Sequence, residues 1–389
     1  MATYADMLDI KNGNLQSQHK RDVWPSLISI KPNRYPFINL LSSVPTRSVD
    51  NQKFELYEID KYPEWVKTAA TYATATTTIK LVDPAGNNVG QALREDDLFR
   101  IGNEIVRVTT TSGASTTVVE RGDASTTATT HATGTYAVYL GTARKGGSTY
   151  RDATSIIPTA KYNYIQTFED SWGVTFEERN TANYTGDTFM QNQLAALERM
   201  KQGAEAAFLF GYQYKETTNK PRHYTKGFLN YATSNVVDYS PGSVSFTVEA
   251  LGEQLFDCGN YGNMKKTVLC SQTLFLAIQQ FVTGNTDAEA RAFKLDGMDH
   301  SFDLNLVKFN YAGISADLVY HPLLAQAYEG YGLIVDMGCV RMAEFGGGLT
   351  VDPLVQDKDE WGQDRSGAHW LTGLDIDNVN AHGVIKGVS

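Results

Sequence analysis

A Thr- and Ala-rich segment from about residue 68 to residue 142 shows no helical periodicity. Inside it, residues 97–122 alternate apolar and polar side chains, which is the pattern of a β-hairpin. Val106 and Val108 share one strand face, and Arg107 lies on the other. The segment therefore predicts a small β-module set into a larger fold, and a module of this kind is usually displayed instead of buried.

Turn signals divide this module into strands. Gly102-Asn103 offers the positive φ angles that a turn before the hairpin needs, and the polar residues 111–115 supply the turn within it. A Gly-rich stretch, 144–148, follows and is expected to be a flexible linker. We expect the inserted module to occupy about residues 74–143.

Length and charge limit the classes of protein that fit. A chain of 389 residues exceeds what one core of roughly 250–300 residues serves, so at least two packed units are expected. The net charge is −10. A protein that binds nucleic-acid phosphates needs a cluster of positive charge, so the negative net charge argues against nucleic-acid binding as the main function. It remains compatible with a position close to nucleic acid without tight binding.

Compartment signals are few. No apolar run approaches the roughly 20 residues that span a bilayer, and residues 1–13 lack both the basic start and the apolar core of a secretory signal. Cys258, Cys270 and Cys339 are too few and too scattered for a disulfide framework, and none forms a CxxC pair. We expect a protein made in a reducing cytosol, with no thiolate zinc site.

Residues 1–45 read as an extended arm. Prolines, among them Pro36, break any helix there, and short apolar anchors such as residues 38–41 alternate with basic pieces. An arm without a core of its own must pack on another domain or subunit. In an acidic protein its positive charges, on Lys20, Arg21, Lys31 and Arg34, favour contact with a neighbouring subunit over contact with nucleic acid.

A strand is expected at residues 162–168, and the longest helix at about 187–213. Thr188 and Gln191 fit a capping box, and Gly211 fits the end of the helix. An apolar stripe along the helix is interpreted as core, not as a cofactor pocket; it comprises Met190, Leu194, Leu197, Ala204 and Phe208.

Residues 246–340 predict a second unit of the α/β kind. Helices are expected at 248–259 and 271–282, and strands at 267–270, 304–310, 316–321 and 333–336. The tail, 341–389, alternates glycine turns, such as Gly346-Gly347-Gly348, with short strands at 368–371 and 383–385.

The order of these parts resembles the major capsid proteins of tailed bacteriophages, which share the Hong Kong phage shell fold also seen in herpesvirus floor domains. The resemblance runs from about residue 15 to residue 389. It rests on the order of the parts and on three short matches: Asn163…Gln166…Phe168, the helix end Glu205–Gly211, and Gly227-Phe228-Leu229.

The resemblance implies an α+β capsid fold with an added all-β insertion. Residues 1–45 would be the N-terminal arm, and 46–170 the extended loop that contains the insertion. The peripheral domain would comprise 171–245 and 341–389 with its spine helix, and the axial domain 246–340. Some members of the family crosslink subunits through Lys and Asn, but the residues needed cannot be placed in this sequence.

Two acidic stretches contain residue types that could bind a metal ion. Residues 357–365 could bind a divalent cation, but a solvated or salt-bridging loop is favoured because Lys358 and Arg365 supply opposite charge. Residues 296–303 gather three carboxylates and a histidine, and His321 is the one plausible further ligand. We interpret the stretch as a turn-rich loop and His321 as the end of a strand. The other histidines, His19, His131, His223, His369 and His382, are dispersed and fit ordinary surface or core positions.

The sequence thus favours a structural protein, the major shell subunit of a tailed phage, located in the virion after assembly in the bacterial cytoplasm. No catalytic, cofactor or metal residues are assigned. The expected partners are other copies of the chain in hexamers and pentamers, together with scaffolding, portal and decoration proteins, around DNA bound without sequence specificity. The alternatives are a tail, baseplate or adhesive protein that displays the β-module, or a hydrolase that uses the acidic stretches.

Overall fold

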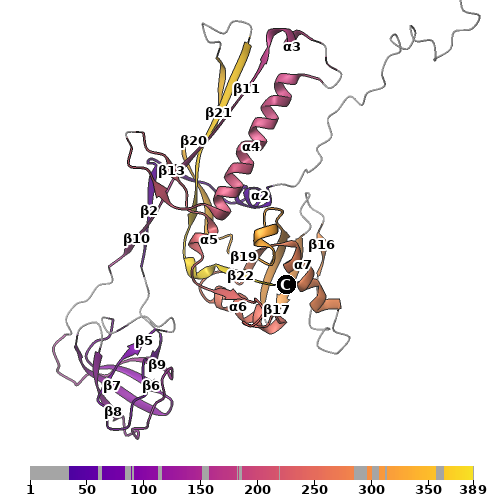
Figure 1. The fold of residues 1–389 in the computed structure, drawn as a ribbon. Coiled ribbons are helices and arrows are strands. Elements are labelled where there is room, and N and C mark those ends of the chain that lie inside the picture. The colour runs from indigo at the N-terminus through magenta and orange to yellow at the C-terminus, as the bar shows by residue number, and fades with distance from the viewer. Residues whose placement is uncertain are drawn as a thin grey trace, which may run out of the picture. The chain divides into compact units, whose positions relative to one another are not determined.

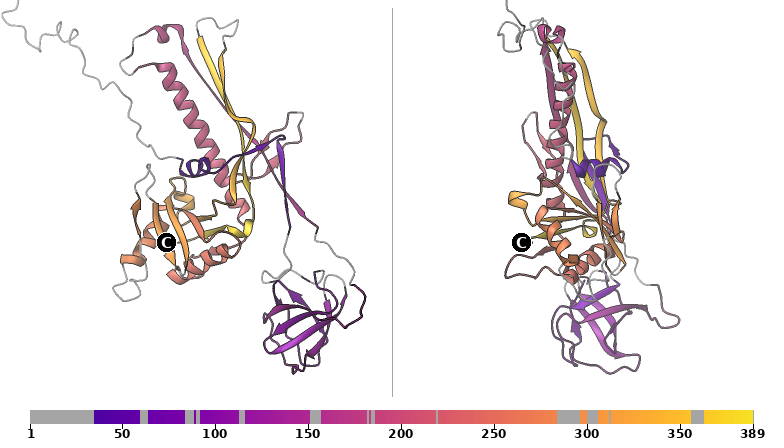
Figure 2. Two further views of the ribbon diagram at one scale, coloured as in Figure 1. Left: turned by 180° about the vertical axis from the view of Figure 1, so that it is seen from behind. Right: turned by 90° about the vertical axis from the view of Figure 1, so that its right-hand side faces the viewer.

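The computed structural model describes residues 35–59, 64–83, 89, 92–112, 116–150, 157–181, 183, 186–218, 220–283, 296–299, 306–311, 313–355 and 363–388. The chain forms two compact units, Met1–Leu56 with Lys161–Ser389 and Tyr57–Ala160 (Figures 1 and 2). Most of the expected N-terminal arm, residues 1–34, lies outside the described residues. Within the described part of the chain, no helix is long and apolar enough to cross a membrane.

The unit Tyr57–Ala160 is a β-module whose strands follow the order β4-β8-β7-β6-β9-β3-β5. β4 and β5 belong to one stretch, residues 78–82, but they stand at opposite ends of this order, where β4 pairs with β8 and β5 pairs with β3. The sheet therefore closes into a small barrel, which protects edges at which other strands could pair. The strands are β3 (Trp65–Thr68), β4 (Thr78–Ile79), β5 (Leu81–Val82), β6 (Asp97–Ile101), β7 (Glu104–Ser112), β8 (Thr116–Asp123) and β9 (Tyr136–Thr142).

The expected hairpin is confirmed as β7 and β8. Val106 and Val108 are 2% and 0% exposed, whereas Arg107 points to the outer face and forms ion pairs with Asp96 and Asp123 at 3.1 and 2.9 Å. In the turn before the hairpin, the positive φ falls on Gly102 alone. The expected bounds of the insertion, 74–143, leave out β3, which pairs with both β5 and β9, so the barrel needs residues that precede those bounds.

The other unit contains a long sheet in the order β1-β20-β21-β11, with helix α4 (Thr188–Phe210) packed on β11 and β21 (Figure 1). The helix has 23 residues, which corresponds to about 34 Å at ~1.5 Å per residue. It ends at Gly211, as expected. The strands are β1 (Arg47–Val49), β11 (Gln166–Thr175), β20 (Val340–Val355) and β21 (Gln363–Ile376), and a short helix, α3 (Phe176–Asn180), follows β11.

Two expectations for this helix are wrong. Its N-cap is Asp187, whose side chain accepts a hydrogen bond from the Phe189 N–H, and not Thr188. Met190 and Leu194 are 53% and 61% exposed instead of forming core. The sheet covers only one face of the helix, so burial follows a different row of residues, namely Ala196, Met200, Ala204, Glu205, Phe208 and Leu209.

The three glycines at 346–348 do not form a turn between strands. They lie within the 16-residue strand β20, where the pairing with β21 shifts register between Glu344 and Leu349. All three have positive φ angles, of 69°, 93° and 81°. Such a bulge needs backbone angles that glycine adopts without a steric cost, which explains the glycine run.

A seven-stranded mixed sheet in the order β14-β22-β19-β15-β18-β17-β16 forms the α/β part of the same unit. Two of its strands come from outside residues 246–340. The expected helices appear as α6 (Val248–Asn260) and α7 (Gln272–Thr283), and the 3₁₀ turns are η2 (Gln326–Tyr328) and η3 (Val379–Ala381). The strands are β14 (Val236–Asp238), β15 (Lys265–Cys270), β16 (Asp296–Asp299), β17 (Leu306–Tyr311), β18 (Ile314–Tyr320), β19 (Gly332–Val335) and β22 (Gly383–Lys386).

Small elements join these parts. The strand expected at 162–168 is interrupted at Ile165, which separates β10 (Thr159–Tyr164) from β11. β10 pairs with β2 (Lys53–Glu58), and β12 (Tyr214–Lys215) pairs with β13 (His223–Tyr224) ahead of α5 (Phe228–Tyr231). Pro36 does not break a helix. It begins α2 (Pro36–Ser42), because proline at the first helical position lacks only an N–H that would have no partner there.

Candidate functional site

The carboxylate of Glu205 joins three distant parts of the chain. It is 0% exposed and accepts hydrogen bonds from the N–H groups of Phe37 and Ile38, each at 2.8 Å. His321 Nε2 lies 2.8 Å from the same carboxylate, while His321 Nδ1 accepts from the Leu323 N–H. The histidine is therefore a donor at Nε2. Glu205, on α4, thus caps the start of α2 and binds the residue that follows β18.

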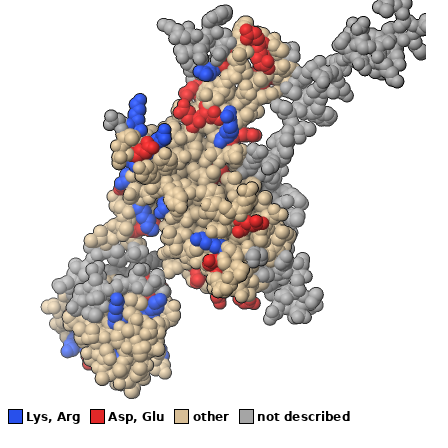
Figure 3. Space-filling view, viewed as in Figure 1, with Lys and Arg blue, Asp and Glu red and all other residues tan. Residues whose placement is uncertain are grey.

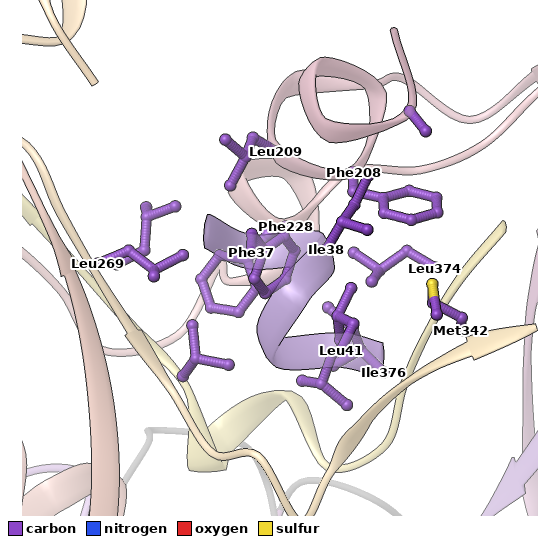
Figure 4. Close-up of a cluster of buried hydrophobic side chains, with 14 of the residues drawn as sticks. Phe37, Ile38, Leu41, Phe208, Leu209, Phe228, Leu269, Met342, Leu374 and Ile376 are labelled. Atoms are coloured by element: carbon purple, nitrogen blue, oxygen red, sulfur yellow. The ribbon is translucent and has the colours of Figure 1, made fainter. Parts of the chain in front are cut away.

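Apolar side chains complete this attachment. Phe37, Ile38 and Leu41 of α2 are at most 5% exposed and belong to the same cluster as the end of α4. Figure 4 shows the α2 side chains pointing into a cluster formed with Phe208, Leu209, Phe228, Leu269, Met342, Leu374 and Ile376. The apolar anchors expected at 38–41 are confirmed, and their partner is the same chain.

Asn163 explains one of the short family matches. Its side chain is 1% exposed, donates to the carbonyl of Leu374 at 2.8 Å and to Thr225 Oγ1 at 3.1 Å, and accepts from the Lys226 N–H at 2.8 Å. One amide therefore holds β10, the segment after β13 and β21 together. An apolar residue of similar size would leave these buried polar groups without partners.

Gly211 and Gly227 explain the other two matches. The Gly227 N–H donates to the Gly211 carbonyl at 2.8 Å. A Cβ on Gly227 would lie 2.4 Å from Gly211 N, and one on Gly211 would lie 2.5 Å from the carbonyl of Ala207. The end of α4 and the start of α5 approach each other so closely that a side chain has no room at either position.

A buried ion pair supports the α/β sheet. Lys266 Nζ lies 2.8 Å from Asp336 Oδ2 and donates to the carbonyl of Ala381 at 3.0 Å; both charged side chains are at most 1% exposed. The Asp336 N–H donates to His382 Nδ1. Burial lowers the pKa of His382 to about 4, so the ring is neutral at pH 7. Its edge contacts the Phe228 ring, with centroids 5.4 Å apart.

The barrel has its own buried carboxylate, Glu104. Its oxygens lie 2.6 Å from Arg121 Nε and 2.8 Å from His131 Nε2, and they accept from the N–H groups of Gly122 and Thr129. Burial alone would raise the pKa of Glu104, but these donors outweigh it and hold the pKa at about 2. The site fixes β7, β8 and the segment before β9, so it is a structural site of the barrel.

The acidic stretches remain mostly outside the described residues. Residues 296–299 form strand β16 and not a loop, while 300–303 are not described. Residues 357–362 are also outside, but Asp364 is 7% exposed, is the second residue of β21 and pairs with Arg179. His321 follows β18, as expected. The described residues contain no group of three or more His, Cys, Asp or Glu side chains that could hold a metal.

The remaining histidines and the cysteines have separate environments. His19 lies outside the described residues, His131 is buried beside Glu104, and His369 lies 3.3 Å from Asp352. Burial lowers the pKa of the half-buried His223, and nearby Lys215 lowers it further. All three thiols are free, and burial raises the pKa of Cys258 to about 12. Burial also raises the pKa of Cys270, so neither Cys258 nor Cys270 is a reactive thiolate at neutral pH.

The buried groups Glu205, Asn163, Lys266 and Glu104 were not identified from the sequence. One signal was present for Glu205, since it interrupts the apolar last turns of α4, where a charge needs a partner. For the others, the partners come from distant segments, so no local pattern marks them.

Comparison with known proteins identifies the fold. The chain aligns over 98% of its length with all of the capsid chain of a native GTA particle, at 10% identity and a TM-score of 0.53. The capsid chain of an empty GTA particle gives 9% identity, the same coverage of 98% and 100%, and a TM-score of 0.53. The chain of Microbacterium phage Oxtober96 aligns at 11% identity and a TM-score of 0.49, covering 97% of this chain and 99% of its own. No curated protein matches the sequence.

The α+β fold is thus that of capsid proteins, as expected. The model of the SU10 major capsid protein family matches residues 9–389, so the chain belongs to that family. It is a structural protein, not an enzyme, and copies of it form the phage head shell of the virion.

Proposed function

We propose that the chain builds the head shell as hexamers and pentamers around packaged double-stranded DNA. The observation that supports this proposal is that the larger unit has two large hydrophobic cores. One core surrounds α4, α2 and the long sheet and also includes side chains of the α/β sheet such as Leu269 and Leu333, and the other lies beneath α6 and α7. The first fits the role of a peripheral domain at 171–245 and 341–389. The second fits the role of an axial domain around which capsomers gather.

The bounds of the axial domain need an adjustment in this proposal. β14 and β22 pair with each other, and β22 continues into the α/β sheet through β19. Residues 236–238 and 383–386 would therefore move with 246–340 in any rearrangement of a capsomer. The barrel, a compact unit by itself, fits an insertion displayed on the outer surface.

We further propose that DNA packs against the shell without specific binding, because the net charge of −10 repels phosphates. Scaffolding, portal and decoration proteins are the expected other partners. In the arm at residues 1–45, the part that precedes α2 would reach a neighbouring subunit, while α2 attaches the arm to its own chain.

Electron microscopy of the purified protein, alone and co-expressed with neighbouring genes of its phage, tests this proposal. We expect closed shells or capsomers with five and six copies. A chain that lacks residues 1–30 should remain soluble but fail to close shells. Trimers or monomers under every condition would contradict the proposal and favour a tail or adhesive protein, and normal shells from the shortened chain would contradict the role of the arm.

A further inference from the structure

Aromatic rings and positive charges meet on the surface near the C-terminal end of α4. Tyr162, Tyr212 and Tyr214 are 45%, 74% and 56% exposed. Lys53 Nζ lies 4.4 Å from the centre of the Tyr162 ring, and Gln213 Nε2 donates to the carbonyl of Tyr162 at 2.8 Å. The hairpin β12–β13 is thereby fixed against β10. We name the surface formed by Tyr162, Tyr212, Tyr214, Lys215, Lys220 and Arg222 the aromatic–basic surface.

The positive charges here are crowded. Burial lowers the pKa of Lys226, and the neighbouring Lys161 lowers it further. The charge of Lys215 likewise lowers the pKa of His223. Glu216 lies near Arg222, at 3.8 Å, and Glu55 pairs with Lys53, so the surface also contains some negative charge. In a chain with a net charge of −10, this local excess of positive charge favours an acidic partner.

A surface of opposite character lies at the other end of α4. Phe176 of α3 is 64% exposed, and the first half of α4 exposes Met190 and Leu194. Glu177, Asp187 and Glu198 are exposed around them. We name the surface formed by these six residues the apolar–acidic surface. Arg179, Arg199 and Lys201 also lie at this end, but Arg179 pairs with Asp364 and Arg199 with Asp170.

The two surfaces cannot meet within one chain. α3 precedes the first turn of α4 and β12 follows its last turn, so about 34 Å of helix separates them. In Figure 3, red atoms lie over α3, and blue atoms lie together with red ones over the β12–β13 hairpin. Exposed apolar groups ringed by charge are typical of contact surfaces between proteins.

We propose that the aromatic–basic surface of one copy binds the apolar–acidic surface of the next copy in a capsomer. The inference rests on the proposed function, since it requires rings of this chain. Such a contact is head-to-tail and uses two different surfaces of each copy. Repeated contacts of this kind close into a ring when the rotation between copies allows it.

Charge reversal tests the contact. In the full chain, K215E together with R222E should raise the subunit concentration needed for half-maximal assembly by at least about tenfold, because like charges would face each other. E177K together with E198K should do the same from the other side. K80E together with K145E is the matched control for K215E with R222E: both lysines are exposed, they lie in the unit Tyr57–Ala160, and the net charge changes by the same amount. We expect this control to assemble as the unchanged chain does.

Mixing the two charge-reversed proteins gives a sharper test. In the mixture, the reversed surface of each protein complements the reversed surface of the other, and their unchanged surfaces complement each other too. Every contact is then favourable only if the two proteins alternate around the ring. Because alternation requires an even number of copies, we expect six-membered rings to return and five-membered rings to remain rare in electron micrographs.

Three results separate the claims. If the unchanged chain forms no shells or capsomers, the proposed function fails. If it assembles and both reversed proteins assemble equally well, only this contact is excluded. The contact is also excluded if the mixture assembles no better than either reversed protein alone, provided that thermal unfolding shows each subunit to be folded.

Discussion

Buried carboxylates connect segments of this chain that lie far apart in the sequence. Glu205, Asp336 and Glu104 are each 0% exposed, and each accepts hydrogen bonds from backbone N–H groups of another segment. A buried charge of this kind is costly when a partner is lost. It therefore specifies one arrangement of segments among many that apolar packing alone would tolerate.

The substitution E205Q tests this role in the larger unit. Glutamine keeps one acceptor oxygen but places an NH₂ group either against the Ile38 N–H or against the Phe37 N–H and His321, so we expect a loss of about 3 kcal/mol or more in unfolding free energy. Urea unfolding of the soluble subunit measures this loss. E198Q, at an exposed position on the same helix, should change the value by no more than about 0.5 kcal/mol. Equal effects of both substitutions would contradict the role of Glu205.

Acid should weaken the barrel through Glu104. Its folded pKa of about 2 lies below its ordinary value of 4.5, so the stabilisation is complete above pH ~4.5 and is lost as the pH falls towards 2. The shift corresponds to roughly 3 kcal/mol. Hydrogen exchange of the β7 and β8 amides between pH 5 and 2.5, corrected for intrinsic rates, should show this loss. In E104Q the corrected protection should be lower and nearly independent of pH, and an unchanged pH dependence in E104Q would contradict the assignment.

At the scale of elements, glycine pairs decide where helices may approach. The end of α4 and the start of α5 touch through Gly211 and Gly227, and the Gly227 N–H donates a hydrogen bond to the Gly211 carbonyl. The register shift in β20 depends on three further glycines with positive φ angles. The first feature lets two backbone segments approach where a side chain has no room, and the second lets the strand adopt φ angles that other residues adopt only with strain.

The substitution G227A should therefore destabilise the subunit by more than about 2 kcal/mol, because the new Cβ would lie 2.4 Å from a backbone nitrogen. Thermal unfolding provides the measurement. G146A is the matched control, since a Cβ there meets no atom within 4 Å and the φ angle is not positive. A G227A subunit as stable as G146A would show that the close approach of α4 and α5 is not required.

The barrel should be removable as a whole but not in part. Excision of residues 60–157 with a short Gly-Ser connection should leave a folded, assembling subunit, because the larger unit has its own cores. Excision of residues 76–142 alone should give aggregated protein, because it leaves β3 without β5 and β9. Solubility and size-exclusion profiles compare the two proteins. Soluble, assembling product from the shorter excision, or insoluble product from the longer one, would contradict this division.

At the scale of the whole molecule, local patterns predict the parts better than the connections between them. The hairpin at 104–123 and the helices α6 and α7 were predictable because one face of each is buried against its own neighbours. Met190 and Leu194 were wrongly assigned to the core, since periodicity does not show which face the sheet covers. The role of Glu205 was missed because its partners lie 116 or more residues away.

The most direct measurement is a reconstruction of the assembled particle by electron cryomicroscopy, at a resolution that traces the chain. We expect rings of five and six copies, with the barrel on the outer surface and the β12–β13 hairpin of each copy against α3 and the first half of α4 of the next. Closed rings joined through other surfaces would contradict the contact. A particle without such rings would contradict the assembly itself.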